Sequence, residues 1–139
     1  MRMPRTPVVG NESVPLVCEQ DIVLARQAVR KAALQLGFSL VDQTKIVTAA
    51  SELARNAVVY AGGGRLELEI VTENGRQGLR LTISDEGKGI EDLTLAMKDG
   101  WTTGTGLGMG LPGTKRLVND FRITSQPGIG TTVIVTRWK

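Results

Sequence analysis

The chain has 139 residues, of which 41% are hydrophobic and 22% are charged, as expected for one globular domain. Its net charge of +3 suits an anionic ligand but is too small to indicate nucleic-acid binding. Aromatic residues make up only 4%, too few for a surface on which single-stranded bases could stack. The absence of histidine excludes a Ser-His-Asp triad, a histidine metal site and a phosphohistidine relay within this chain.

Other features of the composition bear on the compartment. The single Cys18 excludes an intrachain disulfide and fits a reducing environment. The first residues lack the apolar core of a signal peptide, and the longest uncharged run, residues 100–114, is too rich in glycine to be a membrane span. We therefore expect a cytoplasmic protein with no membrane or nucleic-acid partner.

The N-terminal part of the chain predicts a tail, a strand and a helix. Residues 1–12 are rich in Pro, Gly and Asn, so we expect a disordered tail before a single domain of residues 13–139. A short apolar strand is predicted at residues 14–19. Apolar residues then recur at helical spacing in a segment that Asp21 is expected to cap and Gly37 to end.

A second helix and the central strands follow. Ser39 with Asp42 three residues later resembles a capping box, which predicts a helix that runs to about Tyr60. Three glycines end it, and residues 64–73 alternate apolar and polar side chains as a strand with one wet face does. The next strand is predicted at 79–85, after a loop of more than two residues that begins at Asn74-Gly75.

The C-terminal part predicts a short helix at 91–98, a glycine-rich lid at 99–110, a helix at 111–118 and two further strands, 121–125 and 131–138. The element order is then β-α-α-β-β-(α)-α-β-β. Hairpin-linked strands with helices between them predict an α+β fold. We expect a two-layer α/β sandwich whose mixed, mostly antiparallel sheet has its helices on one face.

Two glycine-rich pieces indicate a nucleotide site. Asp85-Glu86-Gly87-Lys88-Gly89 follows the end of a predicted strand, where glycines permit positive φ and close approach of a ligand. Gly104-Thr-Gly-Leu-Gly-Met-Gly-Leu111 runs into a predicted helix, whose N-terminus favours phosphate. The second piece is neither a P-loop nor a dinucleotide fingerprint, and taken alone it is more typical of a plain surface loop.

A third piece lies on the second predicted helix. Glu52 and Asn56 are four residues apart, so they lie on one helix face, one turn from each other. A carboxylate and an amide oxygen beside an apolar stripe are suited to Mg²⁺ and water, because Mg²⁺ prefers hard oxygen ligands. Alone, the pair is also what a solvated helix face would show.

The combination is more specific than its parts. Glu-x-x-x-Asn on a helix, a strand ending in Asp-x-Gly-x-Gly, Gly-x-Gly-x-Gly-Leu before a helix, and Gly130-Thr131 before the last strand occur in this order. This resembles the GHKL ATP-binding fold, also called the Bergerat or histidine-kinase-like ATPase fold, over about residues 40–139. Motifs from about Glu19 onward, among them Ser51-Glu-Leu-Ala-Arg-Asn56, are most similar to the single-domain serine kinases of bacterial partner-switching systems, the RsbT type of the stressosome.

The resemblance implies a role for each matching residue. Asn56 would bind the Mg²⁺ that bridges the ATP phosphates, and Glu52 would be the general base or would orient the acceptor hydroxyl. Asp85 would accept a hydrogen bond from the adenine amino group. Gly87 and Gly89 would let the turn pass over the base, and Thr131 would complete the adenine contact. The glycines that would let the lid close on the phosphates are Gly106, Gly108 and Gly110.

The resemblance also implies an activity. Kinases of this type phosphorylate serine or threonine residues of STAS-domain proteins and, once released, activate an effector such as a PP2C-type phosphatase. An anti-sigma factor kinase and a non-catalytic nucleotide-binding module are the alternatives. The basic face of the first helix, with Arg26 and Arg30, is either a partner-docking surface or a solvated face.

One feature departs from related anti-sigma kinases, which carry a basic residue in the lid near the γ-phosphate. Residues 102–113 contain no Lys or Arg here, and Lys88, Lys98 and Lys115 are the candidates to replace it.

Overall fold

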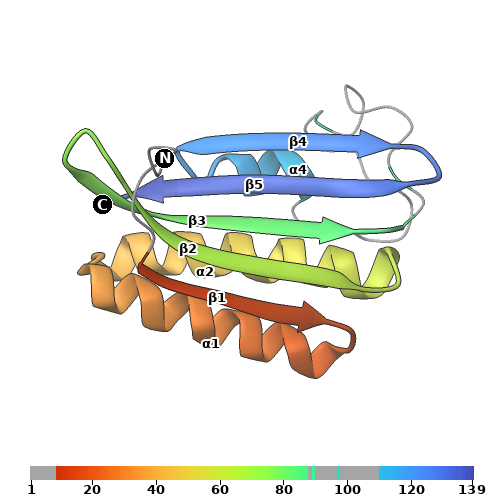
Figure 1. Cartoon of the computed structure of the whole chain (residues 1–139), viewed down its shortest axis with the longest axis horizontal. Coiled ribbons are helices and arrows are strands. Elements are labelled where there is room, and N and C mark those ends of the chain that lie inside the picture. Colours follow the sequence, from red (N-terminus) through yellow and green to blue (C-terminus); the bar gives the residue numbers. More distant parts are fainter. Residues whose placement is uncertain (1–8, 88, 90–96, 98–109) are drawn as a thin grey trace, which may run out of the picture.

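The structure, a computed structural model, describes residues 9–87, 89, 97 and 110–139. Its centre is one sheet in the order β1-β2-β3-β5-β4, in which each neighbouring pair of described strands is antiparallel (Figure 1). The strands are β1 (Val9–Leu16), β2 (Gly64–Glu73), β3 (Arg76–Asp85), β4 (Asp120–Gln126) and β5 (Gly130–Trp138). The predicted antiparallel pairing is confirmed, but the parallel pairing that a mixed sheet implies is not found among the described strands.

Helices α1 (Glu19–Leu36), α2 (Leu40–Arg55) and α4 (Gly110–Lys115) lie on one face of this sheet, which confirms the two-layer sandwich (Figure 1). Strand residues alternate between the two faces, so every second residue of the central strands enters the core. The core is built from these residues and from apolar residues of the two long helices: Leu66, Leu68, Ile70, Leu79, Leu81, Ile83, Val133 and Val135 from the sheet, and Ala25, Val29, Ala33, Ile46, Ala50 and Leu53 from the helices.

The N-terminal elements differ in their bounds from the prediction. β1 begins at Val9, so Val9 and Glu12 of the predicted tail pair with β2, with a register shift between them. Asp21 is not the cap of α1, because Cys18 occupies the cap position. The Asp21 carboxylate instead accepts hydrogen bonds from the backbone of Val17, at 2.8 Å, and of Cys18, at 3.2 Å. An acidic group in this first turn also interacts favourably with the positive end of the helix dipole.

The β2–β3 hairpin is tighter than predicted. Glu73 pairs directly with Arg76, so the loop is only Asn74–Gly75 and β3 begins three residues earlier than expected. Both loop residues have positive φ, 52° and 78°, as a two-residue turn of the primed type requires. The prediction of a longer loop is wrong because Gly78 lies within β3, with Trp138 packed against it, and not in the turn.

Two helix predictions are partly confirmed. Gly37 ends α1 with φ of 81°, and the Ser39 hydroxyl caps α2 by accepting from the Asp42 amide at 3.1 Å. The Asp42 carboxylate, however, bonds to Arg137 of β5. α4 ends at Lys115, three residues earlier than predicted. The predicted helix at 91–98, apart from Met97, and residues 99–109 of the predicted lid fall outside the described residues. No helix in the described ranges has the length and apolar character to cross a bilayer.

Candidate functional site

The last turn of the second long helix changes character where the predicted pair lies. α2 ends at Arg55, and residues Asn56–Tyr60 continue it as a single π-helical turn. π-helical turns are rare and are found frequently at functional sites. Glu52 and Asn56 therefore flank the junction between the α-helix and the wider turn.

Both predicted side chains present an oxygen that is buried and unbonded. Glu52 Oε2 and Asn56 Oδ1 have no hydrogen-bond partner among the described residues. A buried polar atom left without a partner costs about 1–3 kcal/mol, so two on successive turns are unusual without a ligand. Two hard oxygen atoms on one helix face fit the donor set that Mg²⁺ prefers, and the residues present therefore fit the expected cation.

The end of β3 lies against this turn. Asp85 has the same strand parity as the core residue Ile83, so it points toward the helices. Gly64 lies between Asp85 and the π-helical turn: a Cβ on Gly64 would be 3.2 Å from the Asp85 Cβ and 3.3 Å from the Ala57 Cβ. Because Ala57 follows Asn56 directly, the structure brings the predicted adenine ligand and the predicted metal ligand to one end of the sandwich.

The turn after Asp85 is fixed by packing within the protein. Asp85 Oδ1 accepts a hydrogen bond from the Gly87 amide at 2.9 Å. A Cβ on Gly87 would lie only 2.7 Å from the Ala61 Cβ, at the end of the π-helical turn. Gly89 has φ of 76°, and a Cβ there would collide with the carbonyl oxygen of Gln126. These contacts explain both glycines without a ligand, and their predicted role over an adenine base stays a prediction.

The β4–β5 hairpin adds a hydroxyl pair beside Asp85. Thr131 pairs with Asp85 across β3 and β5, and its Oγ1 lies 2.8 Å from the Oγ of Ser125 on β4. A hollow at this end of the sheet is lined by Asp85, Ser125 and Thr131, together with Gly130; Glu52 and Asn56 are not among its lining residues.

Sequence reasoning missed Ser125 as a site residue and gave Gly130 no role. The signal for Ser125 was the hairpin register, which places it opposite Thr131. Gly130 has φ of 149°, and a Cβ there would collide with the carbonyl oxygen of Asp85. Glycine at this position therefore allows the hairpin to lie directly against the end of β3.

The predicted phosphate residues are described only in part. Gly106 and Gly108 fall outside the described residues, as do Lys88 and Lys98. Gly110 begins α4 with φ of 71°, and its carbonyl accepts a hydrogen bond from the buried Thr114 hydroxyl at 3.0 Å. At the other end of this short helix Lys115 is exposed. The structure thus places Gly110 but leaves the basic partner of the γ-phosphate a prediction.

The fold and these motifs define a nucleotide-binding class. Residues 41–139 match the family described as histidine kinase-, DNA gyrase B- and HSP90-like ATPases, and the chain belongs to this family.

Particular relatives narrow the class. The chain is 47% identical to the serine/threonine-protein kinase RsbT of Bacillus subtilis over 125 residues, which is 90% of this chain and 94% of that protein. It is 33% identical to an anti-sigma F factor of Bacillus licheniformis over 85% of this chain and 84% of that protein. The chain is therefore a homologue of a bacterial serine/threonine kinase and, more distantly, of anti-sigma factors.

A solved structure shares the fold. The RsbU and RsbW domains of a Mycobacterium tuberculosis protein superpose with a TM-score of 0.64 at 21% identity, over 96% of this chain and 33% of that one. At this identity the likeness supports the fold alone.

Proposed function

We propose that this protein is a Mg²⁺-dependent serine/threonine protein kinase that transfers the γ-phosphoryl group of ATP to a hydroxyl of a partner protein. The observation that supports this most directly is the pair of buried oxygens on Glu52 and Asn56 that have no hydrogen-bond partner in the described part of the chain, at the same end of the sandwich as Asp85. The family is one of ATPases, and the 47%-identical relative is a serine/threonine-protein kinase.

The proposed roles follow from the chemistry of each group. The Asp85 carboxylate accepts a hydrogen bond from the adenine amino group, and Thr131 lies beside it to complete that contact. Asn56 Oδ1 holds the cation, which supplies charge neutralisation at the phosphates. Gly110, with Gly106 and Gly108 before it in the sequence, is assigned to the phosphates by its place at the start of α4.

Glu52 acts on the acceptor. In the transfer, a bond forms between the acceptor oxygen and the γ-phosphorus while the bond to the β–γ bridging oxygen breaks and ADP leaves. The acceptor hydroxyl must lose its proton, and the Glu52 carboxylate is the group assigned to take it or to orient it. Phosphoryl transfer depends mainly on positioning and electrostatics, and a positioned base contributes about 10²–10⁴-fold.

The test of this role separates binding from transfer. Glu52→Gln keeps the shape of the side chain but removes its basicity, so we expect Mg-ATP to bind with nearly unchanged affinity while the transfer rate falls about 10²–10⁴-fold. Glu67→Gln, on the exposed side of β2, is the matched control and should transfer at the parent rate. Equal transfer rates in the Glu52→Gln variant and the parent would remove Glu52 from the role.

We infer that the partners are those of a switch kinase: STAS-domain proteins as substrates, and an effector such as a PP2C-type phosphatase that binds the released kinase. The relative that supports this is the 47%-identical serine/threonine-protein kinase RsbT. Arg26 and Arg30 are exposed on α1 and form the proposed docking surface. Changing both to Glu should weaken capture of one partner in a pulldown, whereas unaltered capture of both would exclude this surface.

The second candidate function is that of an anti-sigma factor with kinase activity, which the 33%-identical relative supports. Incubation with labelled ATP, a STAS-domain protein and a sigma factor distinguishes the two. Label on the STAS-domain protein without sigma binding supports the switch kinase, and a stable complex with the sigma factor supports the alternative. Nucleotide binding with no transfer would instead support a non-catalytic module.

A further inference from the structure

A charged side chain extends the core-facing row of the last strand. Arg137 has the same parity on β5 as Val133 and Val135, which are buried in the core. Its side chain is only 13% exposed, so the guanidinium lies between the sheet and the helices rather than in solvent. A cation in this position must find partners on the neighbouring elements.

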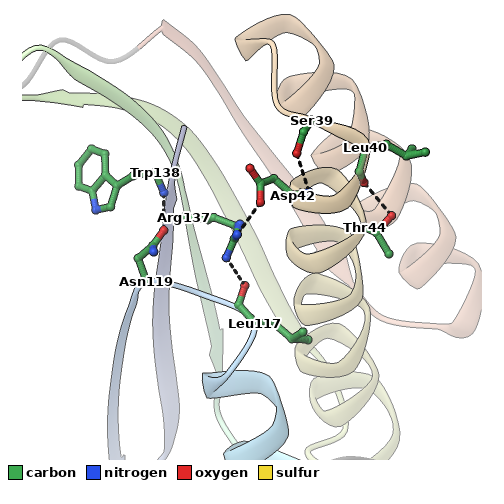
Figure 2. A network of polar contacts seen from close by, with 8 residues as sticks. All are labelled: Ser39, Leu40, Asp42, Thr44, Leu117, Asn119, Arg137 and Trp138. Carbon is green, nitrogen blue, oxygen red and sulfur yellow. Dashed lines mark hydrogen bonds and ion pairs between the residues drawn. The ribbon is translucent and has the colours of Figure 1, made fainter.

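The guanidinium joins two of these elements, as Figure 2 shows. Its Nη2 bonds to Oδ1 of Asp42 in the first turn of α2 at 2.5 Å, and its Nη1 donates to the carbonyl of Leu117 at 3.1 Å. Leu117 lies two residues beyond the end of α4. Arg137 therefore ties the start of α2 to the segment that leaves α4.

The strand that carries Arg137 holds the same segment at further points. The Trp138 amide donates to Oδ1 of Asn119 at 2.7 Å, and the Asn119 amide donates to the carbonyl of Thr136 at 3.0 Å (Figure 2 draws the first). The Trp138 indole Nε1 also donates to Asp120 at 2.9 Å. Backbone on both sides of Arg137 is thus fixed to the α4–β4 connection, and the guanidinium has a rigid base.

Stability alone is a poor explanation for this arginine. Its Nε is buried and has no hydrogen-bond partner among the described residues, so the desolvation cost of the cation is only partly offset. Replacing both members of a buried ion pair with apolar side chains is often neutral for stability, so the pair is weak evidence of a purely stabilising role. What the guanidinium does supply is a rigid planar fork that donates one hydrogen bond to α2 and one to the segment after α4.

We propose that Arg137 is a positioning residue that sets α4 relative to α2 and thereby aligns the phosphate half of the nucleotide site. This rests on the proposed function, because α2 leads to Asn56 at its far end and α4 begins with Gly110. The adenine half, Asp85 with Thr131, is held instead by the direct pairing of β3 with β5.

If Arg137 has this role, its replacement should weaken binding of Mg-ATP but not of adenosine, which lacks the phosphates. In Arg137→Met the stem stays apolar while both contacts are lost, so the affinity for Mg-ATP should fall about 3- to 30-fold. Adenosine, measured by displacement of a fluorescent ATP analogue, should bind within twofold of the parent. Arg122→Met is the matched control, because Arg122 is exposed on β4 and points away from the helices. It should leave both affinities unchanged.

Urea unfolding of each variant shows whether the protein is folded at the assay temperature. A loss of affinity that is equal for Mg-ATP and adenosine, or no loss for either, would overturn the positioning role. If Arg137→Met does not fold, Asp42→Asn is the variant for the test, because it removes the charge but keeps an oxygen acceptor. It should lower Mg-ATP affinity at least twofold with adenosine unaffected, and unchanged Mg-ATP affinity overturns the proposal.

The parent protein separates this inference from the proposed function. Failure of the parent to bind Mg-ATP would refute the nucleotide site itself. Binding by the parent, together with no selective loss in the variants, would refute only the role of Arg137.

Discussion

Replacing Asn56 with leucine should stabilise the nucleotide-free protein while it abolishes Mg-ATP binding. The buried Asn56 Oδ1 has no hydrogen-bond partner among the described residues. Such an atom costs about 1–3 kcal/mol, and leucine has the same branching and number of side-chain heavy atoms without the oxygen. After an allowance for small packing changes, we expect the free energy of unfolding to rise by about 1 kcal/mol, or about 3–5 °C in the unfolding midpoint.

The assay is urea unfolding with and without Mg-ATP. A ligand at 100 times its Kd stabilises the folded parent by about 2.7 kcal/mol, and the Asn56→Leu variant should lose this increment. Gln27→Leu, at an exposed position of α1, controls for the general effect of adding an apolar helical residue and should keep the increment. A variant that is less stable than the parent, yet still stabilised by Mg-ATP, would refute both the free-energy cost assigned to the Asn56 oxygen and the role of Asn56 as a metal ligand.

Three further predictions follow from individual contacts. Asp85→Asn should weaken ATP binding about ten- to a hundredfold, or roughly 1.5–3 kcal/mol, in a calorimetric titration, and unchanged affinity would contradict the adenine assignment. Gly130→Ala forces a Cβ into the Asp85 carbonyl at φ of 149°, so unfolding should become easier by at least about 2 kcal/mol; Gly128→Ala, with open space at φ of 80°, should cost only about 1 kcal/mol. Asp42→Asn should lower the free energy of unfolding by about 0.5–1.5 kcal/mol at pH 7, because the hydrogen bond from Arg137 holds the Asp42 pKa below its ordinary value. This contribution is present above the unfolded-state pKa and is lost as the pH falls through the folded-state pKa, so parent and variant should converge below about pH 4 in acid-dependent unfolding, and a constant gap would contradict it.

Local patterns predicted most of the fold. The alternation in β2 and the Ser39 cap of α2 were visible in the sequence, because each depends on residues that are neighbours along the chain. The start of β1 at Val9 was not, since its pairing with β2 is a contact between distant segments that overrides a Pro- and Gly-rich composition. The bond of Asp42 to Arg137 was hidden for the same reason.

The candidate site divides in the same manner. The spacing of Glu52 and Asn56 on a helix predicted that they share a face, and each contributes a buried oxygen that has no hydrogen-bond partner within the described ranges. The π-helical turn beside them could not be predicted, because an extra residue in a helical turn leaves no mark in apolar periodicity. Ser125 needed the register of a hairpin whose turn residues alone do not fix it.

The π-helical turn also makes this part of the chain intolerant of changes in length. Deleting one residue between Ala57 and Tyr60 would let the α-helix continue, and everything after it would rotate by about 100° around the helix axis. Ala57 would then no longer rest on Gly64, and the strand that follows would begin out of phase with its neighbours. Insertions and deletions among homologues of this chain should therefore collect in surface turns such as Asn74–Gly75 and avoid these few residues.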